Sequence, residues 1–473
     1  MPDQPQSSHQ TRTNALSTGA TGYRFPRRTI LLLAVSLTGA FIGFNTGMVA
    51  VALPEIRSEF DVGLPFASWV ISGYLVAFVV LQPVGGRLGD NFGRGRVFFF
   101  GIAISMAASL GAAFAWNVPS LILLRVGQAA GWAVLVPNGY AMLREAYSAA
   151  DRGKAFGWAS LVSIVFAGIG PIVGGAVVGV DWRGLFFVTA GNLGILSILA
   201  LLSVPRWKPP RLNGDPVDYV GVILLAGVVL SIAVTTTLIT DGLPALISGA
   251  VMLILGAAFF FWERRFAVPI VRLSLFRIKT FAAGSSGAML SQMMIYTALV
   301  ITPLYLAEVS SLSPLRVGLL IGGMLIPSGF ISLGGGWLAD RLGRRAPITL
   351  GGIVGAVTLG ALVAFGLDSG VVIYALLIGI FGLGFGILHA PLQTAVVEAT
   401  PTQIAANASG VFQMSRHLGA MVGAALVGAI VGSGVGGSTI GDVRLVFGIM
   451  AGAGVALTLS SFGIHRWPST TPA

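Results

Sequence analysis

The charged residues of this sequence gather in two short segments of similar pattern. Residues 85–97 read GGRLGDNFGRGRV and residues 335–347 read GGWLADRLGRRAP, in a chain that is 10% charged and 55% hydrophobic. Asp90 and Asp340 can each accept hydrogen bonds from amides at a helix N-terminus, and neighbouring arginines can pair with the aspartate or with lipid headgroups. Such a cluster predicts a gate that is made in one conformation and broken in another. The alternative is a basic turn that only fixes membrane orientation.

A second group of chemically active residues lies inside apolar segments. Arg125 stands several residues inside one segment, where a charge costs at least about 2.5 kcal/mol unless it meets a cavity or a partner. Gln128 follows three positions later on the same helical face, and Asn45 is expected at a similar depth. These residues predict a substrate cavity or coupling site. The alternative for Arg125 is a side chain that extends to the membrane surface.

The same argument applies to the second half of the chain. Arg416 falls near the middle of one apolar segment and His389 inside the preceding one, where a histidine is either a hydrogen-bonded packing residue or a proton carrier. No acidic residue lies deep in any segment. We therefore expect a neutral to positive cavity that favours neutral, amphiphilic or anionic molecules over permanent organic cations. On this basis Asn45→Asp is expected to make the cavity more favourable to cationic dyes.

Several kinds of chemistry are excluded or disfavoured. The chain has no cysteine, and its four histidines lack metal-binding spacing, so we expect no metal and no cofactor. No Gly-x-x-x-x-Gly-Lys-[Ser/Thr] loop and no Ser/His/Asp arrangement occurs, which argues against ATP hydrolysis and against an enzyme. The net charge of +11 is spread over loops and not over one soluble module, which argues against a nucleic-acid partner.

The elements that must position these residues are membrane-spanning helices. The mean hydropathy is +0.88. About fourteen apolar segments are long enough to cross a bilayer, at 28–53, 65–86, 97–116, 119–142, 155–180, 184–204, 217–238, 243–262, 281–306, 316–338, 346–367, 371–396, 405–431 and 443–463. About 22 of the 28 Lys and Arg residues fall in the tails and in alternate loops. Basic residues mark cytoplasmic loops, so both termini are expected in the cytoplasm.

The chain also repeats itself. Asp90 and Asp340 are about 250 residues apart, and Pro137 and Pro391 about 254 apart. Parallel six-helix halves with a substrate site between them are a known transporter plan. The predicted organisation is a disordered cytoplasmic tail, a six-helix bundle, an inserted two-helix hairpin with basic flanks outside the substrate path, a second six-helix bundle and a second tail, at 1–27, 28–206, 207–279, 280–466 and 467–473.

Five motifs in this order resemble those of the major facilitator superfamily, in particular its fourteen-helix drug:proton antiporter branch. The two charged segments resemble the loop 2–3 signature and its second-half copy through Gly86, Asp90, Gly93, Arg94, Gly336, Asp340, Gly343 and Arg344. LILLRVGQAAG (121–131) resembles the helix-4 signature. GIGPIVGG (168–175), followed by Asp181-Trp182-Arg183, resembles the helix-5 antiporter motif, with Gly168, Gly170, Pro171, Gly174 and Gly175. Trp69-Val-Ile-Ser-Gly-Tyr74 also fits this branch.

The resemblance implies an all-α polytopic transporter of the cell membrane, monomeric, that exports drugs, antibiotics or metabolites in exchange for protons. The helix-5 glycines imply a hinge or seal that favours export, although they also fit ordinary close packing of helices. One departure weakens the coupling inference, because Asn45 stands where the branch usually has an aspartate. Two alternatives stay open, an importer or facilitator of the same fold and a non-transporting membrane sensor or scaffold.

Overall fold

The computed structural model of the chain is helical, without a strand, throughout the residues it describes, which are 25–147, 149–204, 218–239, 241–266, 269–309, 312–400, 405–431 and 439–465. Within these ranges, fourteen helices are long and apolar enough to cross a membrane. Each predicted segment coincides with one of them, which confirms the prediction of an all-α polytopic membrane protein. The predicted tails lie outside the described residues, apart from residues 25–27.

The fourteen long helices, together with one short one, have the following bounds: α2 Phe25–Glu59, α3 Leu64–Ala67, α4 Trp69–Phe92, α5 Arg94–Ala113, α6 Val118–Ala146, α7 Ala149–Val178, α8 Gly184–Ser203, α9 Tyr219–Thr237, α10 Gly242–Arg265, α11 Lys279–Val309, α12 Pro314–Leu342, α13 Arg345–Ala361, α14 Val371–Glu398, α15 Ala405–Val431 and α16 Thr439–Ser460. Short 3-10 segments occur at Leu273–Arg277 and Ser461–Gly463, and a π-helical turn at Leu362–Gly366 follows α13. Helices α3 and α4 together form the second crossing.

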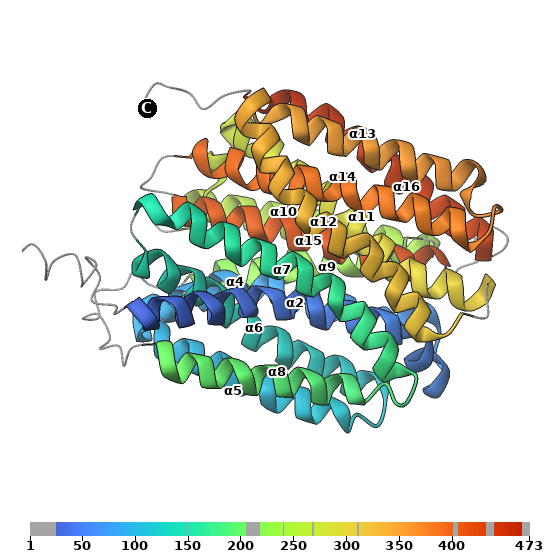
Figure 1. Cartoon of the computed structure of the whole chain (residues 1–473), viewed down its shortest axis with the longest axis horizontal. Coiled ribbons are helices and arrows are strands. Elements are labelled where there is room, and N and C mark those ends of the chain that lie inside the picture. Colours follow the sequence, from blue (N-terminus) through green and yellow to red (C-terminus); the bar gives the residue numbers. More distant parts are fainter. Residues whose placement is uncertain are drawn as a thin grey trace, which may run out of the picture.

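The helices form two groups that lie side by side (Figure 1). Helices α2 and α4–α8 pack on one another and are called the first bundle, and α11–α16 form the second bundle. The bundles meet mainly along three helix pairs, α2 with α11, α4 with α15, and α7 with α12. The parallel repeat in the sequence therefore appears as two sets of six helices. Of the three pairs, only α2 and α11 are counterparts in the repeat, whereas α4 meets the counterpart of α7 and α7 meets the counterpart of α4.

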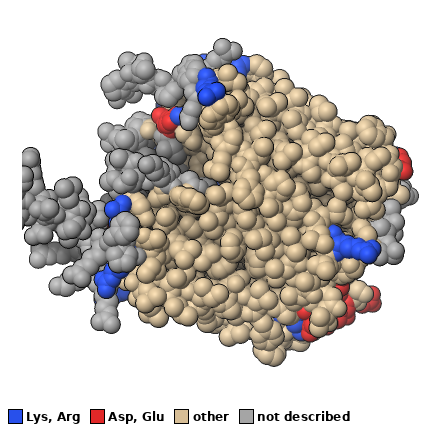
Figure 2. Space-filling model, viewed as in Figure 1, with Lys and Arg blue, Asp and Glu red and all other residues tan. Residues whose placement is uncertain are grey.

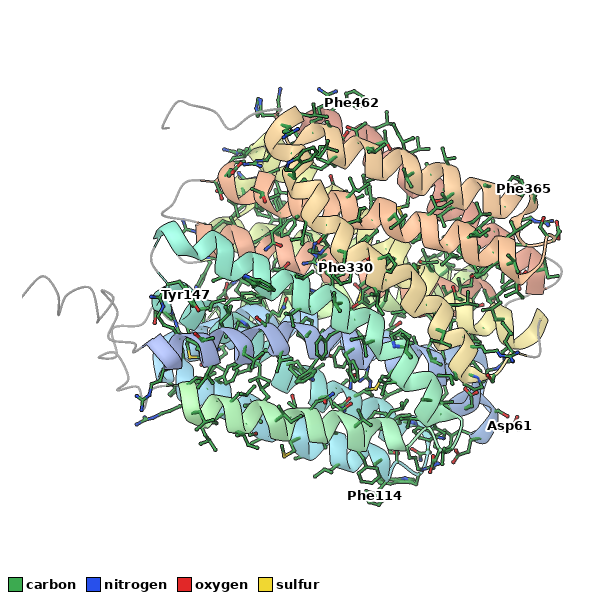
Figure 3. All side chains as sticks on the ribbon, viewed as in Figure 1. Asp61, Phe114, Tyr147, Phe330, Phe365 and Phe462 are labelled. Atoms are coloured by element: carbon green, nitrogen blue, oxygen red, sulfur yellow. The ribbon has the colours of Figure 1, made fainter. Side chains whose placement is uncertain are left out.

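Polar and apolar residues are distributed as a bilayer requires. On the face shown in Figure 2, acidic and basic side chains gather at the two ends of the helices and leave an uncharged band between them. Tyr147 and Phe462 lie at the end where α2 begins and α16 ends, here called the terminal end (Figure 3). Asp61, Phe114 and Phe365 lie at the opposite end, here called the far end. Loops and helix ends thus carry the charge, and the helices between them can face lipid.

Helices α9 and α10 form a hairpin between the two halves of the sequence. Helix α9 packs on α4 of the first bundle and on α15 of the second, so it lies over one seam between them. Helix α10 packs on α9 and exposes large apolar residues along its length, among them Leu246, Leu253 and Ile254. At its base, Asp218 caps α9 by accepting from the Gly221 amide at 2.8 Å. The hairpin therefore contacts both bundles through α9.

Candidate functional site

Helix α6 carries Arg125 into the interior of the first bundle. The helix is started by a capping box, in which Asn117 Oδ1 accepts from the Ser120 amide at 2.8 Å. Arg125 follows about 10 Å farther along the axis, at 1.5 Å of rise per residue. Its side chain is completely buried, with 0% exposure, and does not extend to the surface. A buried guanidinium of this kind requires hydrogen-bonding partners to offset its lost hydration.

Polar groups of three helices supply partners for its Nε and Nη1, whereas Nη2 is buried without a hydrogen-bond partner. Arg125 Nη1 donates to Gln128 Oε1 at 2.8 Å and also to Asn45 Oδ1 on α2. Its Nε donates to the Val70 carbonyl on α4 at 3.2 Å, and its guanidinium carbon lies 4.2 Å from the centroid of the Tyr74 ring. These partners are amide oxygens and an aromatic face, not carboxylates. Neutral groups therefore stabilise the guanidinium without neutralising it, and the site stays positively charged.

The network continues outward to two more helices. Asn45 Nδ2 donates to Thr189 Oγ1 on α8 at 2.8 Å, and Gln128 Nε2 donates to Ser109 Oγ on α5 at 2.8 Å. Asn45 is 1% exposed and Gln128 is 0% exposed. The predicted trio of Asn45, Arg125 and Gln128 is thus brought together, as a polar core that ties five helices of the first bundle to one another.

A second polar centre lies in the second bundle. Arg416 on α15 donates from Nη1 to Gln413 Oε1 at 2.9 Å, and its Nη2 lies 2.9 Å from His389 Nε2 on α14. Because an arginine only donates, His389 Nε2 must be the acceptor, which makes this imidazole neutral with its proton on Nδ1. His389 also packs against Phe385, with ring centroids 5.5 Å apart. Unlike Arg125, Arg416 is only partly buried.

Tyrosines connect the second centre to the first bundle. Tyr140 of α6 and Tyr296 of α11 both lie within electrostatic range of Arg416. Tyr296 is hydrogen-bonded to Thr46, the neighbour of Asn45 on α2. The two polar centres are therefore connected across the interface between the bundles through Tyr296 and Thr46, which follows Asn45 directly on α2. Groups from α2, α6, α11, α14 and α15 converge there, which can bind a solute from both sides.

The two gate segments lie at the terminal end, each at the close of a long helix. Arg94 forms an ion pair with Glu145 at the end of α6, and Arg344 forms one with Glu398 at the end of α14. Each pair joins helices of the same bundle. The side chains of Asp90 and Asp340 lie outside the described residues. The described part of the gate thus braces each bundle internally.

The glycines of these segments have distinct reasons to be glycine. Gly93 and Gly343 have φ values of 92° and 84°, which side chains other than hydrogen rarely allow, and both are helix C-caps. A Cβ on Gly86 would meet only Pro137 at 3.7 Å, and one on Gly336 would meet nothing within 4 Å. The positive φ angle therefore explains why residues 93 and 343 are glycines. At Gly86 and Gly336 a side chain would fit, so close packing does not explain the glycine there.

The glycines of the antiporter motif lie on two faces of α7. A Cβ on Gly170 would lie 2.3 Å from the Phe44 carbonyl oxygen, and one on Gly174 would lie 2.7 Å from Met48 Cα, both on α2. The other two glycines face α12 of the second bundle: a Cβ on Gly168 would lie 2.8 Å from Ile326 N, and one on Gly175 would lie 2.2 Å from the Pro314 carbonyl oxygen. The motif therefore lets α7 pack closely on α2 of its own bundle and on α12 of the second bundle.

Helix α12 also contributes glycines to this contact. A Cβ on Gly318 would lie 2.2 Å from the carbonyl oxygen of Pro171, and one on Gly329 would lie 3.0 Å from Ile164 Cγ2. Farther toward the terminal end, a Cβ on Gly334 would meet nothing within 4 Å. These close contacts, here called the glycine seam, run from Gly175 to Gly329 and so occupy the far half of the α7–α12 interface. Pro171, which lacks an amide hydrogen, lies in its centre.

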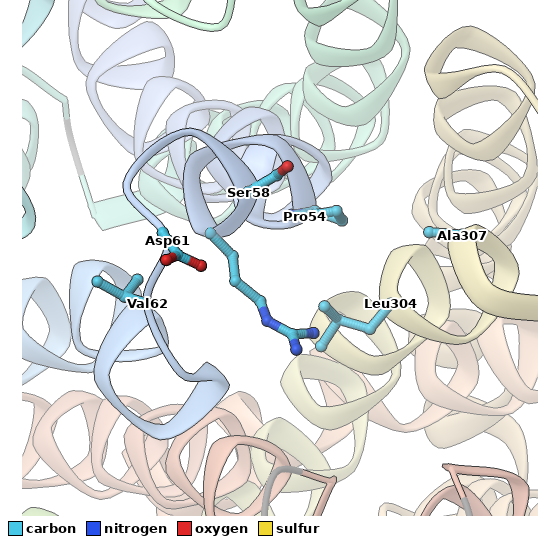
Figure 4. Close-up of a pocket in the computed structure, with 7 residues that line it drawn as sticks. Pro54, Ser58, Asp61, Val62, Leu304 and Ala307 are labelled. Carbon is cyan, nitrogen blue, oxygen red and sulfur yellow. The ribbon is translucent and has the colours of Figure 1, made fainter.

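One pocket of about 310 Å³ opens at the far end. Its lining comes from the end of α2, the turn that follows, and the end of α11: Pro54, Arg57, Ser58, Asp61, Val62, Leu304 and Ala307. Figure 4 shows Asp61 and Val62 on one side of it and Leu304 and Ala307 on the other. Arg183 forms an ion pair with Glu59 at 2.7 Å and also donates a hydrogen bond to it, and these contacts stabilise this end of the first bundle. The pocket is thus walled by both bundles.

Sequence reasoning missed several of these groups. Glu145, Tyr140, Tyr296 and Gln413 were not singled out. The internal repeat carries a signal for the first, because Glu145 and Glu398 stand about 253 residues apart, the same offset that relates the two prolines. The tyrosines carry no such signal, because their approach to Arg416 depends on how the bundles face each other.

Comparisons with known proteins agree with this architecture. The family model described as Major Facilitator Superfamily matches residues 35–424 and 287–471. An uncharacterized MFS-type transporter, YvkA, of Bacillus subtilis is 29% identical over 84% of this chain and 89% of its own. The tetracenomycin C resistance and export protein of Streptomyces glaucescens is 27% identical over 92% of this chain and 81% of its own. Among solved structures, a peptide transporter POT in complex with sulfate superposes with a TM-score of 0.67 at 18% identity, covering 91% of this chain and 93% of that one.

These relatives are transporters and not enzymes. The family model extends over nearly the whole described chain, and the fold it implies is the one described above. The chain therefore belongs to the major facilitator superfamily.

Proposed function

We propose that this transporter exports small hydrophobic or amphiphilic compounds, such as drugs, antibiotics or metabolites, by alternating access driven by proton entry. The observation that carries the proposal is the glycine seam, in which α7 and α12 approach so closely that added methyl groups would overlap backbone atoms. It supplies a seal at the far end that relative motion of the two bundles can open. The tetracenomycin C exporter, matched over 92% of this chain, supports export over import.

The orientation in the cell membrane follows from charge. Basic residues gather at the terminal end, so we place that end and both termini in the cytoplasm and the far end outside. In this orientation the seam closes the outer side of the substrate path. A compound that enters from the cytoplasm or the inner leaflet then reaches the two polar centres, and export requires the seam to part.

The substrates we propose are neutral, amphiphilic or anionic, and permanent organic cations are disfavoured. Among the described side chains, Arg125 and Arg416 are the charged groups deep in the helices, and neither pairs with a carboxylate. A cation at this depth would meet two positive charges in a medium of low dielectric constant, where repulsion is strong. For the proton, the described carboxylates lie near helix ends, among them Glu55, which is half-buried with one oxygen unpartnered.

The test is accumulation of a panel of neutral, anionic and cationic fluorescent compounds in cells with and without the protein. We expect lower accumulation of neutral and anionic compounds in cells that carry it, and we expect an uncoupler to abolish the difference. Accumulation unchanged across the whole panel would overturn the export proposal and favour a sensor or scaffold. Higher accumulation would indicate an importer. Strong export of monovalent cations would overturn the proposed charge preference alone.

A further inference from the structure

The second polar centre contains a cation that the bundle itself leaves uncompensated. Arg416 stands near the middle of α15, where burying a charge is expensive and usually reflects function. Its two hydrogen-bonding partners are both neutral, because Gln413 is an amide and His389 must accept from the arginine. Among the described residues, Arg416 interacts electrostatically with Tyr140, Tyr296 and two histidines, and with no carboxylate. The site therefore keeps a full positive charge.

The guanidinium is also held in a fixed position with donors to spare. An arginine has five N–H donors, and the contacts to Gln413 and His389 occupy one on each terminal nitrogen. Arg416 is partly exposed, and no nitrogen of its side chain is both buried and without a partner. Its partial exposure leaves the side chain within reach of a solute, with N–H donors that no described residue occupies. Preorganisation by neutral neighbours lowers the entropy lost when such a group binds an anion.

Arg125 provides an internal comparison. It has 0% exposure, and its contacts to Asn45, Gln128 and the Tyr74 ring lie entirely within the first bundle. That arginine is part of the packing of one bundle. Arg416, in contrast, is approached by tyrosines from both bundles, Tyr140 from α6 and Tyr296 from α11. The same residue type therefore lies inside one bundle in the first half and at the interface of the two bundles in the second.

We propose that Arg416 binds an acidic group, such as a carboxylate, of the transported compound, with Tyr140 and Tyr296 packing on or donating to its organic body. This inference rests on the proposed export function and narrows its substrate class to amphiphilic organic anions. The planar guanidinium matches a carboxylate in two-point geometry, and tyrosines offer an apolar ring with a hydroxyl. Because Tyr296 is hydrogen-bonded to Thr46 of α2, an anion held here touches groups of both bundles. Binding can therefore influence how the bundles move.

The experiment uses two matched probes, 7-diethylaminocoumarin-3-carboxylic acid and its neutral ethyl ester. Uptake of each is measured in inside-out membrane vesicles that contain the full chain, with a pH gradient imposed. Binding of the acid to the purified protein is measured separately by fluorescence anisotropy. In Arg416→Gln we expect binding and uptake of the acid to fall at least about tenfold, because hydrogen bonds to a charged group are among the stronger ones. Uptake of the ester should stay within about twofold.

A second variant removes the charge without removing the arginine. Gln413→Glu places a carboxylate beside Arg416 Nη1, where the amide oxygen now accepts at 2.9 Å. This internal anion should compete with the acid probe, so we expect the same selective loss as in Arg416→Gln. Equal loss of acid and ester in both variants, or no loss of acid binding in either, would overturn the proposal.

The two proposals fail in different ways. If the purified wild-type protein binds the acid in an Arg416-dependent manner but vesicles transport neither probe, the anion site stands and the proposed export function is wrong. If the vesicles transport the ester and the acid equally well in wild type and in Arg416→Gln, export stands and the anion site is wrong.

Discussion

At the scale of single residues, burial separates two arginines that look alike in sequence. Both were placed in the substrate cavity or coupling group on the strength of depth alone. Arg125 is fully buried among amide oxygens, whereas Arg416 keeps partial exposure at the interface of the bundles. Depth in a segment is readable from sequence. The direction that a side chain takes around its helix, toward its own bundle or toward the other, depends on packing that sequence periodicity gave no means to resolve here.

The structure changes the expectation for Asn45. The sequence alone predicts that Asn45→Asp improves export of cationic dyes, on the assumption that this side chain faces the cavity. Asn45 is 1% exposed and its oxygen accepts from Arg125. A carboxylate at this position would therefore neutralise the buried guanidinium and would not be available to a transported cation.

For Asn45→Asp we expect a higher thermal midpoint, because an uncompensated buried charge costs about 3–5 kcal/mol and pairing removes part of that cost. We expect no gain in export of ethidium, a permanent cation. Thermal unfolding of the purified variant and ethidium accumulation in cells measure the two effects. A lowered midpoint together with new ethidium export would show that Asn45 reaches the cavity after all.

At the scale of helices, the glycine seam explains why one motif holds glycines at four positions. Gly170 and Gly174 face α2, and Gly168 and Gly175 face α12, so each pair is spaced by about one or two turns. The sequence predicted close packing or a hinge at this motif. It did not predict the complementary glycines of α12, because the α12 segment contains more glycines than those that lie on the contact face.

Helix α12 offers a matched pair of variants that test the seam. A Cβ at Gly318 would lie 2.2 Å from the carbonyl oxygen of Pro171, whereas one at Gly323 would meet nothing within 4 Å. Overpacking costs about 1–3 kcal/mol, so Gly318→Ala should shift the conformational equilibrium about tenfold or more away from the closed seam. Gly323→Ala changes helix propensity equally without the overlap.

We therefore expect Gly318→Ala to slow uptake into inside-out vesicles at least about tenfold, with Gly323→Ala close to wild type. Labelling of a single cysteine introduced at Ser58, beside the far-end pocket, reports the same shift as faster reaction with a membrane-impermeant maleimide. Equal uptake and labelling in the two variants would mean that the seam tolerates a methyl group and does not act as a seal.

At the scale of the whole molecule, the sequence was sufficient for the number of helices and for their two-fold repeat. Hydropathy over about 20 residues is a strong signal, and the charged segments in register at Asp90 and Asp340 revealed the duplication. The fourteen helices confirm the predicted number of crossings. The contacts between the halves could not be predicted from the sequence, because no sequence pattern specifies which face of α15 meets Tyr140. The gate provides the clearest example, since Arg94 and Arg344 pair within their own bundles.

The absence of cysteine from the chain makes the motion of the bundles directly testable. A Cβ at Gly329 would lie 3.2 Å from Val165 Cγ2, across the seam from α12 to α7. In the double variant Gly329→Cys, Val165→Cys we expect an oxidant to link the bundles and abolish transport, and a reductant to restore it, because alternating access requires the halves to separate.

Each single cysteine variant serves as the control and should be insensitive to oxidant. Transport that continues in fully cross-linked protein would contradict alternating access by relative movement of α7 and α12. The extent of cross-linking is read from the shift in electrophoretic mobility of protein cleaved between the two halves.

The position of α9 has a mechanical consequence for any such movement. This helix contacts α4 and α15 at once, so rotation of one bundle against the other shears its packing on that flank, while no comparable strap was found across α7 and α12 among the described helices. The resistance is therefore unequal on the two flanks. The gap between the bundles should therefore widen less beside the hairpin than along α7 and α12, so the two bundles open as a wedge and do not stay parallel.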